Sequence, residues 1–414
     1  MIIKYLIILI FIPSVIFSKE KNNLFEYNIN ITVSDDTIFI NTLLKGEFKG
    51  NLLLLNSLSN IRHFKINEKV GEFTFSNDTL SYLNEKMEVN SIRIDYFFIK
   101  NDYSLDSIII LKNEGLWFPR ISNSIFNYKL DINYKEKEYY LISANKNNNY
   151  FGVNKSSISV LFLPKNTYKI FKLKNNKIEY NYYSLKEIKI DSLFINEFIY
   201  SSNYFINFFN KKVYNTLNII QISSKKFNIC QSLNQCIIFG DYFYNLHTNF
   251  PKNSWIPHEV CHQWWGRDLL FNNKSINYRF IEESFTEYLK YTYINNKYGM
   301  KAFNDVIDNS RYMYDYVIND TNVVSIRSIE KLNNQVNNIV IYCKGPLLLN
   351  YINNSCDMDI NDFIKDIYKE YNNTMLSYNN VEEILKSFDE IYLPLFNDLL
   401  NSKKDIEYHI ANKQ

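Results

Sequence analysis

The sequence predicts an α+β fold, in which a β-rich N-terminal half precedes a mainly helical C-terminal half. Short apolar and alternating runs recur up to about residue 190, which is typical of strands in a sandwich or a curved sheet. Beyond that point, apolar residues recur at helical spacing. The chain has 414 residues, of which 46% are hydrophobic, so it is long and apolar enough for two or three domains with a substantial core.

The first residues have the pattern of a signal peptide. Lys4 supplies a short positive start, an almost wholly apolar run extends from Tyr5 to Phe17, and Ser18 is a small residue near its end. The run is short for a membrane span. We therefore expect residues 1–18 to be a cleaved signal peptide. The protein would then be exported to the periplasm, the cell surface or the medium, and it would be a membrane anchor only if this segment is left uncleaved.

Residues 19–190 should form the β-rich domain. Charged or Asn-rich turns separate nine candidate strands, at 28–33, 37–44, 50–55, 61–66, 91–99, 107–111, 128–132, 138–143 and 157–162. The change of pattern that marks the domain boundary falls within 180–195, and we place the boundary after residue 190.

Residues 191–414 should form the second domain. It begins with a helix at 191–212 and continues with candidate strands at 217–222 and 236–239. Further helices are expected at 254–267, 281–297, 301–316, 340–353, 359–371 and 380–400. Core packing is sufficient to explain their apolar stripes.

Net charge and cysteine content bear on two classes of function, nucleic-acid binding and zinc-knuckle sites. The formal net charge is +2 and 22% of the residues are charged, so no nucleic-acid partner is indicated. The five cysteines cannot all pair within the chain. Cys230 and Cys236 either form a disulfide or remain as buried thiols, and their spacing matches no zinc-knuckle pattern.

Residues 258–262, with the sequence HEVCH, carry the chemistry. Two histidines four residues apart lie on one face of a helix, so both imidazoles can bind one metal ion. Glu259 lies beside them and is placed to take a proton from a water that the metal activates. Pro257 fits the first turn of such a helix, with Ser254 as its candidate N-cap. The chain has only five histidines, so an accidental match is improbable.

A zinc site needs a third protein ligand, and the next helical segment offers carboxylates. Glu283 and Glu287 are one turn apart on a shared face. One of them can bind the metal while the other fixes a histidine ring from behind. The preference of a helix N-terminus for negative charge is enough to explain Glu282.

These segments resemble the catalytic core of the membrane alanyl aminopeptidase family of gluzincin metallopeptidases. HEVCHQWWG followed by IEESFTEYL is similar to the family's HExxH-Gln-Trp-aromatic-Gly and Asn-Glu-Gly-Phe-x-Glu-Tyr motifs. The resemblance implies a thermolysin-like domain with one Zn²⁺, bound by His258, His262 and Glu283, and with Glu259 as general base. The segment IYCKG resembles the family's Tyr-x-Lys-Gly signature, which gives Tyr342 the role of stabilising the oxyanion.

The resemblance extends over roughly the whole mature chain. Trp117-Phe118-Pro119 resembles a Trp-aromatic-Pro segment of bacterial relatives, and residues 358–388 resemble the helical end of the catalytic domain. The resemblance therefore implies a short bacterial-type form without the large C-terminal helical domain of the full-length aminopeptidases.

Two departures from the family pattern bear on function. The spacing from His262 to Glu283 is two residues longer than in the family, with the extra residues expected in the loop 271–277, so Glu282 is the alternative ligand. The family's Gly-x-Met-Glu-Asn strand, whose glutamate binds the substrate's α-amino group, corresponds here to residues 231–235 and has no glutamate. Asn234 cannot offer the same charge.

The predicted activity is hydrolysis of peptide bonds in peptides or proteins by a zinc-activated water, with Glu259 as the base. One alternative is a true aminopeptidase whose amine-binding acid comes from elsewhere, with Glu282, Asp241 and Asp268 as candidates. Another is a non-catalytic exported protein that binds metal or peptide, which the presence of Glu259 and Tyr342 disfavours. Ordinary surface or core roles are expected for the other histidines, which are His63, His247 and His409.

Overall fold

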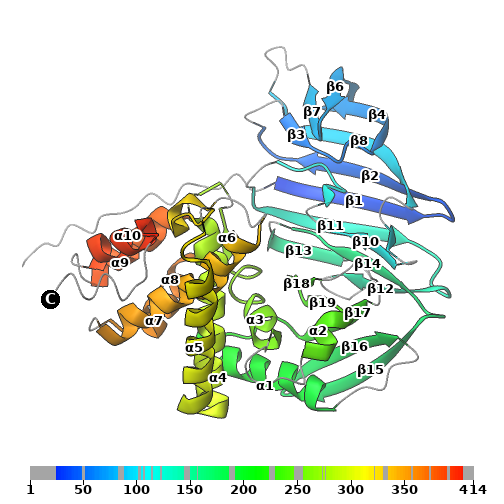
Figure 1. Cartoon of the computed structure of the whole chain (residues 1–414). Coiled ribbons are helices and arrows are strands. Elements are labelled where there is room, and N and C mark those ends of the chain that lie inside the picture. Colours follow the sequence, from blue (N-terminus) through cyan, green and yellow to red (C-terminus); the bar gives the residue numbers. More distant parts are fainter. Residues whose placement is uncertain are drawn as a thin grey trace, which may run out of the picture.

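The computed structural model describes residues 25–403 with short gaps (Figure 1). The gaps are residues 49–51, 83–87, 101–103, 106–107, 113–114, 122–123, 144–149, 156, 186–191, 223–228, 247–254, 273, 276, 321, 330–333, 356–357, 373 and 389–391. The expected signal peptide therefore lies outside the described residues, as do His247, Ser254, Cys356 and His409. Within the described part, no helix is long and apolar enough to cross a membrane.

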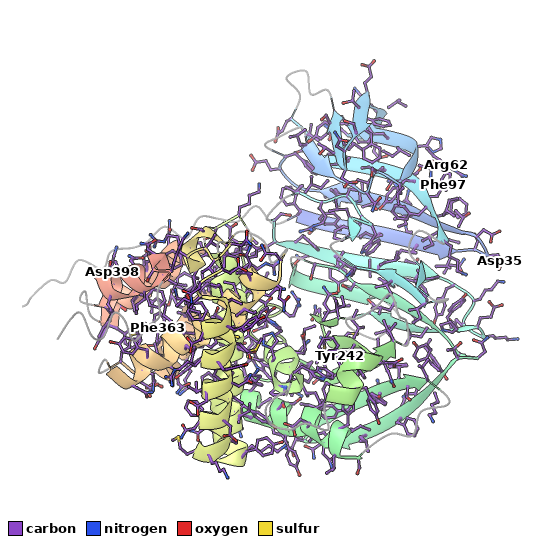
Figure 2. All side chains as sticks on the ribbon, viewed as in Figure 1. Asp35, Arg62, Phe97, Tyr242, Phe363 and Asp398 are labelled. Atoms are coloured by element: carbon purple, nitrogen blue, oxygen red, sulfur yellow. The ribbon has the colours of Figure 1, made fainter. Side chains whose placement is uncertain are left out.

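A seven-stranded sheet dominates the N-terminal half. Its strands, in spatial order, are β13 (Tyr150–Lys155), β11 (Phe126–Asn133), β1 (Phe25–Val33), β2 (Thr37–Lys45), β8 (Ser91–Ile99), β4 (Asn60–Ile66) and β5 (Lys69–Val70). Every second residue of β2 and β8 is buried, so one face of the sheet packs on the core. On the other face, the guanidinium of Arg62 lies 4.8 Å from the ring centre of Phe97 (Figure 2).

Two smaller sheets contribute side chains to the same hydrophobic core. One consists of β3 (Leu52–Leu54), β7 (Thr79–Tyr82) and β6 (Phe73–Ser76), and the other of β12 (Tyr139–Ser143), β14 (Val160–Pro164), β10 (Ile108–Leu111) and β9 (Ser104–Leu105). Trp117 is fully buried in this core. Its indole N–H donates to the carbonyl of Ile158, and its own carbonyl accepts from the hydroxyl of Tyr96. The Trp-Phe-Pro segment therefore packs the N-terminal half.

A five-stranded sheet begins the second half. Its spatial order is β15 (Tyr168–Asn175), β16 (Ile178–Leu185), β17 (Thr216–Ile222), β19 (Cys236–Gly240) and β18 (Cys230–Leu233). β16, β17 and β19 are parallel, whereas β18 is an antiparallel edge strand. The helices α1 (Ser192–Phe209) and α2 (Asp241–Leu246) complete this part of the chain. Because β16 pairs with β17, one sheet continues across the region where the sequence places the domain boundary.

Helices dominate the remainder of the chain (Figure 1). They are α3 (Ile256–Cys261), α4 (Phe285–Tyr298), α5 (Met300–Val317), α6 (Gln335–Ile339), α7 (Gly345–Ser355), α8 (Ile360–Tyr371), α9 (Tyr378–Phe388) and α10 (Tyr392–Asn401). A 3₁₀ turn lies at Ile326–Ser328, and β20 (Leu270–Phe271) pairs with β21 (Met375–Leu376). These helices share one large core with α1 and the inner strands. The expectation of a β-rich half followed by a mainly helical half is confirmed.

Two expected helices differ from the structure. The helix expected at 254–267 already ends at Cys261, and tight turns then direct both Trp264 and Trp265 into the core, where each indole N–H donates to a backbone carbonyl. A continuous helix would turn these neighbouring side chains about 100° apart. The helix expected at 380–400 is two helices, α9 and α10. Pro394 lies in the first turn of α10, where a proline is tolerated, whereas it would interrupt the interior of one long helix.

Two π-helical turns face each other beside α3. The first, Phe280–Ser284 (η4), leads into α4, and the second, Val340–Lys344 (η6), leads into α7. The hydroxyl of Ser284 donates to the carbonyl of Ile341 at 2.7 Å. A Cβ on Gly345 would lie only 2.0 Å from Ser284 Oγ, so the two turns can pack this closely only because residue 345 has no side chain.

Gly345→Ala should therefore destabilise the fold. We expect the free energy of unfolding to fall by about 1–3 kcal/mol, since the added methyl group overlaps the Ser284 side chain. The check is urea unfolding of the two single variants and the double variant. In a Ser284→Gly background the overlapping atoms are gone, so the same alanine should cost much less. An equal cost in both backgrounds would contradict the close packing of the two turns.

Candidate metal centre and active site

Helix α3 presents the two histidines of the HEVCH segment. Pro257 lies in its first turn as the sequence predicted, but the N-cap residue is Trp255 instead of the expected Ser254, and it makes no side-chain capping hydrogen bond. His262 is the C-terminal cap residue, and its backbone N–H donates to the carbonyl of His258 at 3.2 Å. This bond keeps the two residues one helical turn apart, and both side chains are buried.

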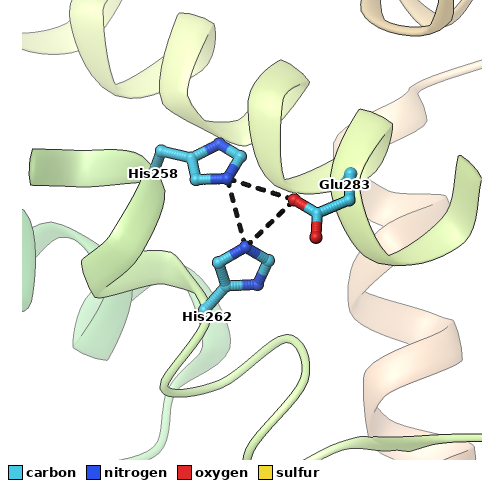
Figure 3. Close-up of side chains that lie close together, drawn as sticks. All are labelled: His258, His262 and Glu283. Atoms are coloured by element: carbon cyan, nitrogen blue, oxygen red, sulfur yellow. Dashed lines mark hydrogen bonds and ion pairs between the residues drawn. The ribbon is translucent and has the colours of Figure 1, made fainter. Parts of the chain in front are cut away.

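The π-helical turn η4 brings Glu283 to the same point. His258 Nε2 lies 3.1 Å from His262 Nε2, and Glu283 Oε2 lies 3.3 Å and 3.4 Å from these two nitrogens (Figure 3). Among the described residues, these three are the group of His, Cys, Asp and Glu side chains whose ligand atoms converge closely enough to hold a metal ion. The structure thus brings together all three ligands expected from the sequence.

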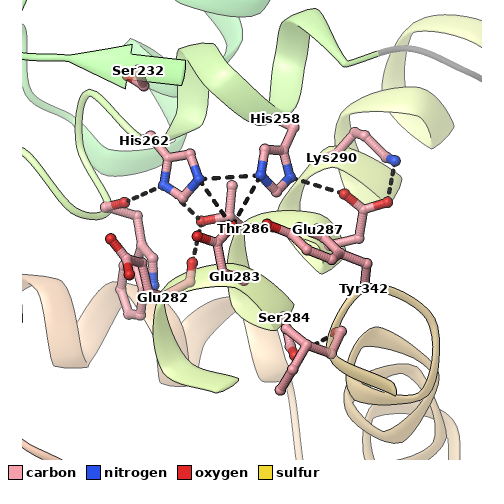
Figure 4. A network of polar contacts seen from close by, with 12 residues as sticks. Ser232, His258, His262, Glu282, Glu283, Ser284, Thr286, Glu287, Lys290 and Tyr342 are labelled. Carbon is pink, nitrogen blue, oxygen red and sulfur yellow. Dashed lines mark hydrogen bonds and ion pairs between the residues drawn. The ribbon is translucent and has the colours of Figure 1, made fainter. Parts of the chain in front are cut away.

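The back of each histidine ring is held by an acceptor. His258 Nδ1 lies 2.9 Å from Glu287 Oε2, and His262 Nδ1 lies 3.0 Å from the carbonyl oxygen of Trp265 (Figure 4). A carboxylate and a carbonyl can only accept, so both Nδ1 atoms carry hydrogen, and in the neutral rings both Nε2 atoms are free to bind a metal.

This donor set fits zinc. Two imidazole nitrogens and a carboxylate oxygen are common zinc ligands, and ligands at about 2.0–2.1 Å from a tetrahedral zinc ion lie about 3.3 Å from one another. The three distances in the structure, 3.1–3.4 Å, agree with that spacing.

Electrostatics favour charged groups at this point despite its burial. Burial opposes a charged imidazole, but hydrogen bonds to Glu283 and Glu287 outweigh it and raise the pKa of His258 to about 10 in the metal-free protein. Burial also opposes ionisation of Glu283, yet the two histidines hold its pKa well below the ordinary value. The site therefore stabilises a positive charge in contact with an ionised carboxylate.

Glu282, the alternative ligand, points elsewhere. Its Oε2 accepts from Arg279 Nη1 at 3.1 Å, and it is not one of the three converging groups. The same guanidinium nitrogen lies 3.6 Å from Glu283 Oε1, the oxygen that faces away from the histidines. The structure therefore places Glu283 among the three converging candidate ligands and Glu282 in an ion pair beside it.

Glu259 and Tyr342 both line a cavity of about 410 Å³ next to His258. Tyr342 lies in the second π-helical turn, and its hydroxyl donates to Glu283 Oε2 at 2.9 Å. Burial and the nearby Glu283 carboxylate raise the pKa of Tyr342 well above its ordinary value, so its O–H stays protonated. The two residues expected to act in catalysis therefore share one cavity at the edge of the metal site.

Residues 227–401 match the peptidase family M1 domain. The chain therefore carries a peptidase family M1 domain. This finding confirms the expected family, a peptidase activity and a requirement for one zinc ion, for which His258, His262 and Glu283 form the matching ligand group. The match does not test the roles of single residues, which stay predictions.

Two solved structures share the fold over most of their length. A variant of a two-domain M1 zinc metallopeptidase bound to L-arginine is 10% identical in sequence, with a TM-score of 0.68 over 92% of this chain and 94% of that one. An M1 zinc metallopeptidase from Deinococcus radiodurans is 8% identical, with a TM-score of 0.66 over 93% and 94%. At these identities the likeness is one of fold. No curated protein matches the chain.

The edge strand β18 of the M1 domain lies beside α3, the helix that carries His258. Gln263, directly after His262, accepts from the backbone N–H of Gln235, and its amide donates to Ser232 Oγ and to the carbonyl of Leu233. Gln263 thus ties the β18–β19 hairpin to α3. Residues 230–235 contain no carboxylate, so the hairpin offers hydrogen bonds but no negative charge at this edge.

The other acids considered for binding an α-amine lie away from the cavity. Asp241 accepts from Gln221 at 2.9 Å, and Asp268 is bound by Lys211 at 2.6 Å and by the hydroxyl of Tyr368. Neither acid lines the cavity, and neither does Glu282. Among the described residues, the acids that line it are Glu259 and Glu287.

The cysteines within the described residues, Cys230, Cys236, Cys261 and Cys343, are free thiols. Cys230 and Cys343 line the cavity. Burial, together with the nearby Glu259 carboxylate, raises the pKa of Cys230 well above its ordinary value, so this thiol stays neutral.

Two residues of the site were not found from the sequence. Lys290 is only 8% exposed and lines the cavity, although a lysine on a helix in a lysine-rich chain is usually exposed to solvent. Gln263 was seen only as part of the family motif. The spacing of Lys290, seven residues after Glu283 and three after Glu287, was the available signal, because residues so spaced share a helical face.

Zinc binding should release about one proton per ion at neutral pH. His258 is protonated in the metal-free protein below its pKa of about 10, whereas a zinc ligand must be neutral. Raising the pH removes the competing proton, so zinc affinity should rise about tenfold per pH unit near neutrality. Calorimetric titrations in buffers of different ionisation enthalpy measure the proton directly. A heat of binding that is independent of the buffer would contradict the assignment.

Proposed function

We propose that this M1 domain hydrolyses peptide bonds at the site formed by His258, His262 and Glu283, with Glu259 as general base and Tyr342 as oxyanion donor. One observation carries the proposal: three buried metal-ligand atoms converge within 3.4 Å beside a cavity that both proposed catalytic side chains line. A scaffold that only bound metal would need neither Glu259 nor Tyr342.

When bound, zinc supplies a Lewis acid that polarises the scissile carbonyl and lowers the pKa of a water molecule. Glu259 follows His258 directly on α3, so its carboxylate lies at the mouth of the metal site. It takes a proton from the attacking water and then gives it to the leaving amine nitrogen. The neutral thiol of Cys230 lies beside this carboxylate and adds no competing charge.

Tyr342 is suited to stabilise negative charge on the carbonyl oxygen. A phenol whose pKa lies well above the ordinary value keeps its proton and can donate it in a hydrogen bond. Its position in the π-helical turn η6 brings the hydroxyl to Glu283 Oε2, the oxygen that faces the two histidines, and Tyr342 also lines the cavity beside His258.

The substrate specificity that we favour does not depend on a free amino terminus. The hairpin next to α3 carries no carboxylate, and the acids proposed as substitutes are engaged elsewhere. A polypeptide lying along the edge strand β18 would form backbone hydrogen bonds whether or not its amino end is blocked, at positions other than the Ser232 carbonyl, which Arg267 already binds.

An aminopeptidase is the second candidate. The observation in its favour is that Glu259 and Glu287 line the cavity, where a positively charged amine would be attracted. One structural neighbour of similar fold binds L-arginine, a free amino acid. A free amino acid is what an aminopeptidase releases, so both specificities need to be tested.

Glu259→Gln should separate metal binding from catalysis. The amide has the same shape but cannot take a proton, so the variant should keep one zinc per chain and lose peptidase activity by at least about 10²–10⁴-fold. His262→Ala is the matched variant on the same helix, and it should bring zinc below one ion per chain. Elemental analysis and a fluorogenic peptide assay measure both effects. Near-normal turnover in Glu259→Gln would exclude the proposed base, and full zinc content in His262→Ala would exclude that ligand.

Matched peptides with free and acetylated amino termini should both be cleaved. We expect their kcat/KM values to agree within about tenfold, because no buried carboxylate of the hairpin has to be paired with an α-amine. Cleavage products are identified by mass spectrometry, with Glu259→Gln as the blank. Cleavage of the free-amine peptide alone would establish the aminopeptidase instead. An inactive protein with full zinc would contradict both readings.

A further inference from the structure

Behind the proposed zinc ligand His258 lies a buried chain of charged groups. Lys290 donates from its ammonium group to Glu287 Oε1, and Glu287 Oε2 lies 2.9 Å from His258 Nδ1 (Figure 4). The opposite nitrogen of the same ring, Nε2, faces the other two ligand atoms. The two oxygens of one carboxylate therefore connect a lysine on α4 to a metal-binding imidazole on α3.

The burial of Glu287 and Lys290 makes their pairing important. Glu287 and Lys290 are each 8% exposed, so both groups are largely withdrawn from water. An ionised carboxylate in such a place is costly unless it is paired. Glu287 accepts from the imidazole on Oε2 and from Lys290 on Oε1, and the hydroxyl of Tyr291 also lies close to it. Without the ammonium group, Oε1 would lose its charged partner, and the carboxylate could turn toward the cavity that it lines.

We propose that Lys290 is a positioning residue of the metal centre, which holds Glu287 in the orientation that fixes the His258 ring and thereby strengthens zinc binding. The inference rests on the ligand set of the proposed function. The sequence already suggested Glu287 as a support for a histidine ring. The new element is Lys290, whose positive charge holds Glu287 from the side opposite His258.

The same helix supplies a matched control. Lys297 lies seven residues further along α4 and forms a similar ion pair, with the buried carboxylate of Glu197. Glu197 contacts Tyr293 and Tyr298 but no metal ligand. Loss of Lys297 therefore removes a comparable ion pair from the same helix without touching the zinc site.

The experiment measures zinc affinity by competition with a chelator, which needs no enzymatic turnover. Lys290→Met should weaken zinc binding about 10–100-fold, the usual effect of removing a support behind a ligand. Lys290→Arg should stay within about threefold of the natural protein, since the longer side chain keeps the charge and can extend into the adjoining cavity. Lys297→Met should leave the affinity unchanged.

A double-mutant cycle tests whether Lys290 acts through Glu287. In a Glu287→Gln background, Lys290→Met should have little further effect on zinc affinity, because the carboxylate that the lysine holds is gone. This double variant also leaves no unpaired buried charge, so it provides a folded protein even if Lys290→Met alone is unstable.

The outcomes separate this inference from the proposed function. A natural protein that binds no zinc would overturn the proposed function itself. Stoichiometric zinc with wild-type affinity in Lys290→Met would overturn the role of Lys290 alone. Equal losses in Lys290→Met and Lys297→Met, or additive losses in the double variant, would show that the lysine affects only general stability.

Discussion

The arrangement of the helices around the site depends on one constraint, the close contact of two buried imidazoles, His258 and His262, with the buried carboxylate of Glu283. Polar groups brought within 3.1–3.4 Å of each other away from water are costly unless each is paired. Glu287 and the Trp265 carbonyl pair with the Nδ1 atoms of the two rings, and Arg279 faces the outer oxygen of Glu283. A bound zinc ion would pair with the remaining atoms, the two Nε2 nitrogens and Glu283 Oε2. Local order at this point rests on hydrogen bonds that converge from α3, η4 and α4.

Backbone irregularity places the remaining groups. Glu283 and Tyr342 each lie in a π-helical turn, and the two turns pack against each other through Ser284 and the bare backbone of Gly345. A π-helical turn widens the helix and shifts the face that its side chains occupy, a feature often found at functional sites. The proposed ligand Glu283 and the proposed oxyanion donor Tyr342 therefore meet, with the Tyr342 hydroxyl donating to Glu283 Oε2.

Sequence reasoning succeeded where the chemistry is local. The pair His258 and His262 follows from one helical turn, and the alternation of β2 and β8 follows from a two-residue period. It left Glu282 as an alternative to Glu283, because the spacing from His262 is two residues longer than in the family that the sequence resembles, and only the structure shows which side chain faces the histidines. It could not foresee that β16 pairs with β17, or that Lys290 is buried, because both facts depend on contacts with distant parts of the chain. The predicted end of α3 was wrong for a similar reason. The helix ends early because Trp264 and Trp265 both pack into the core, which depends on distant contacts.

The residues proposed for catalysis and those next to the proposed substrate path belong to different elements, the helix α3 and its neighbours on one side and the β18–β19 hairpin on the other. The proposed metal ligands and Glu259 lie on helices and turns in which buried hydrogen bonds fix the two histidine rings. The hairpin at β18 is joined to this framework through the amide of Gln263, which contacts Ser232, Leu233 and Gln235. Apart from the Ser232 hydroxyl, these contacts involve backbone groups, so they fix where the hairpin lies while depending on only one of its side chains. The hairpin can therefore lose a charge that recognises an amine while the neighbouring metal site keeps its full set of ligands.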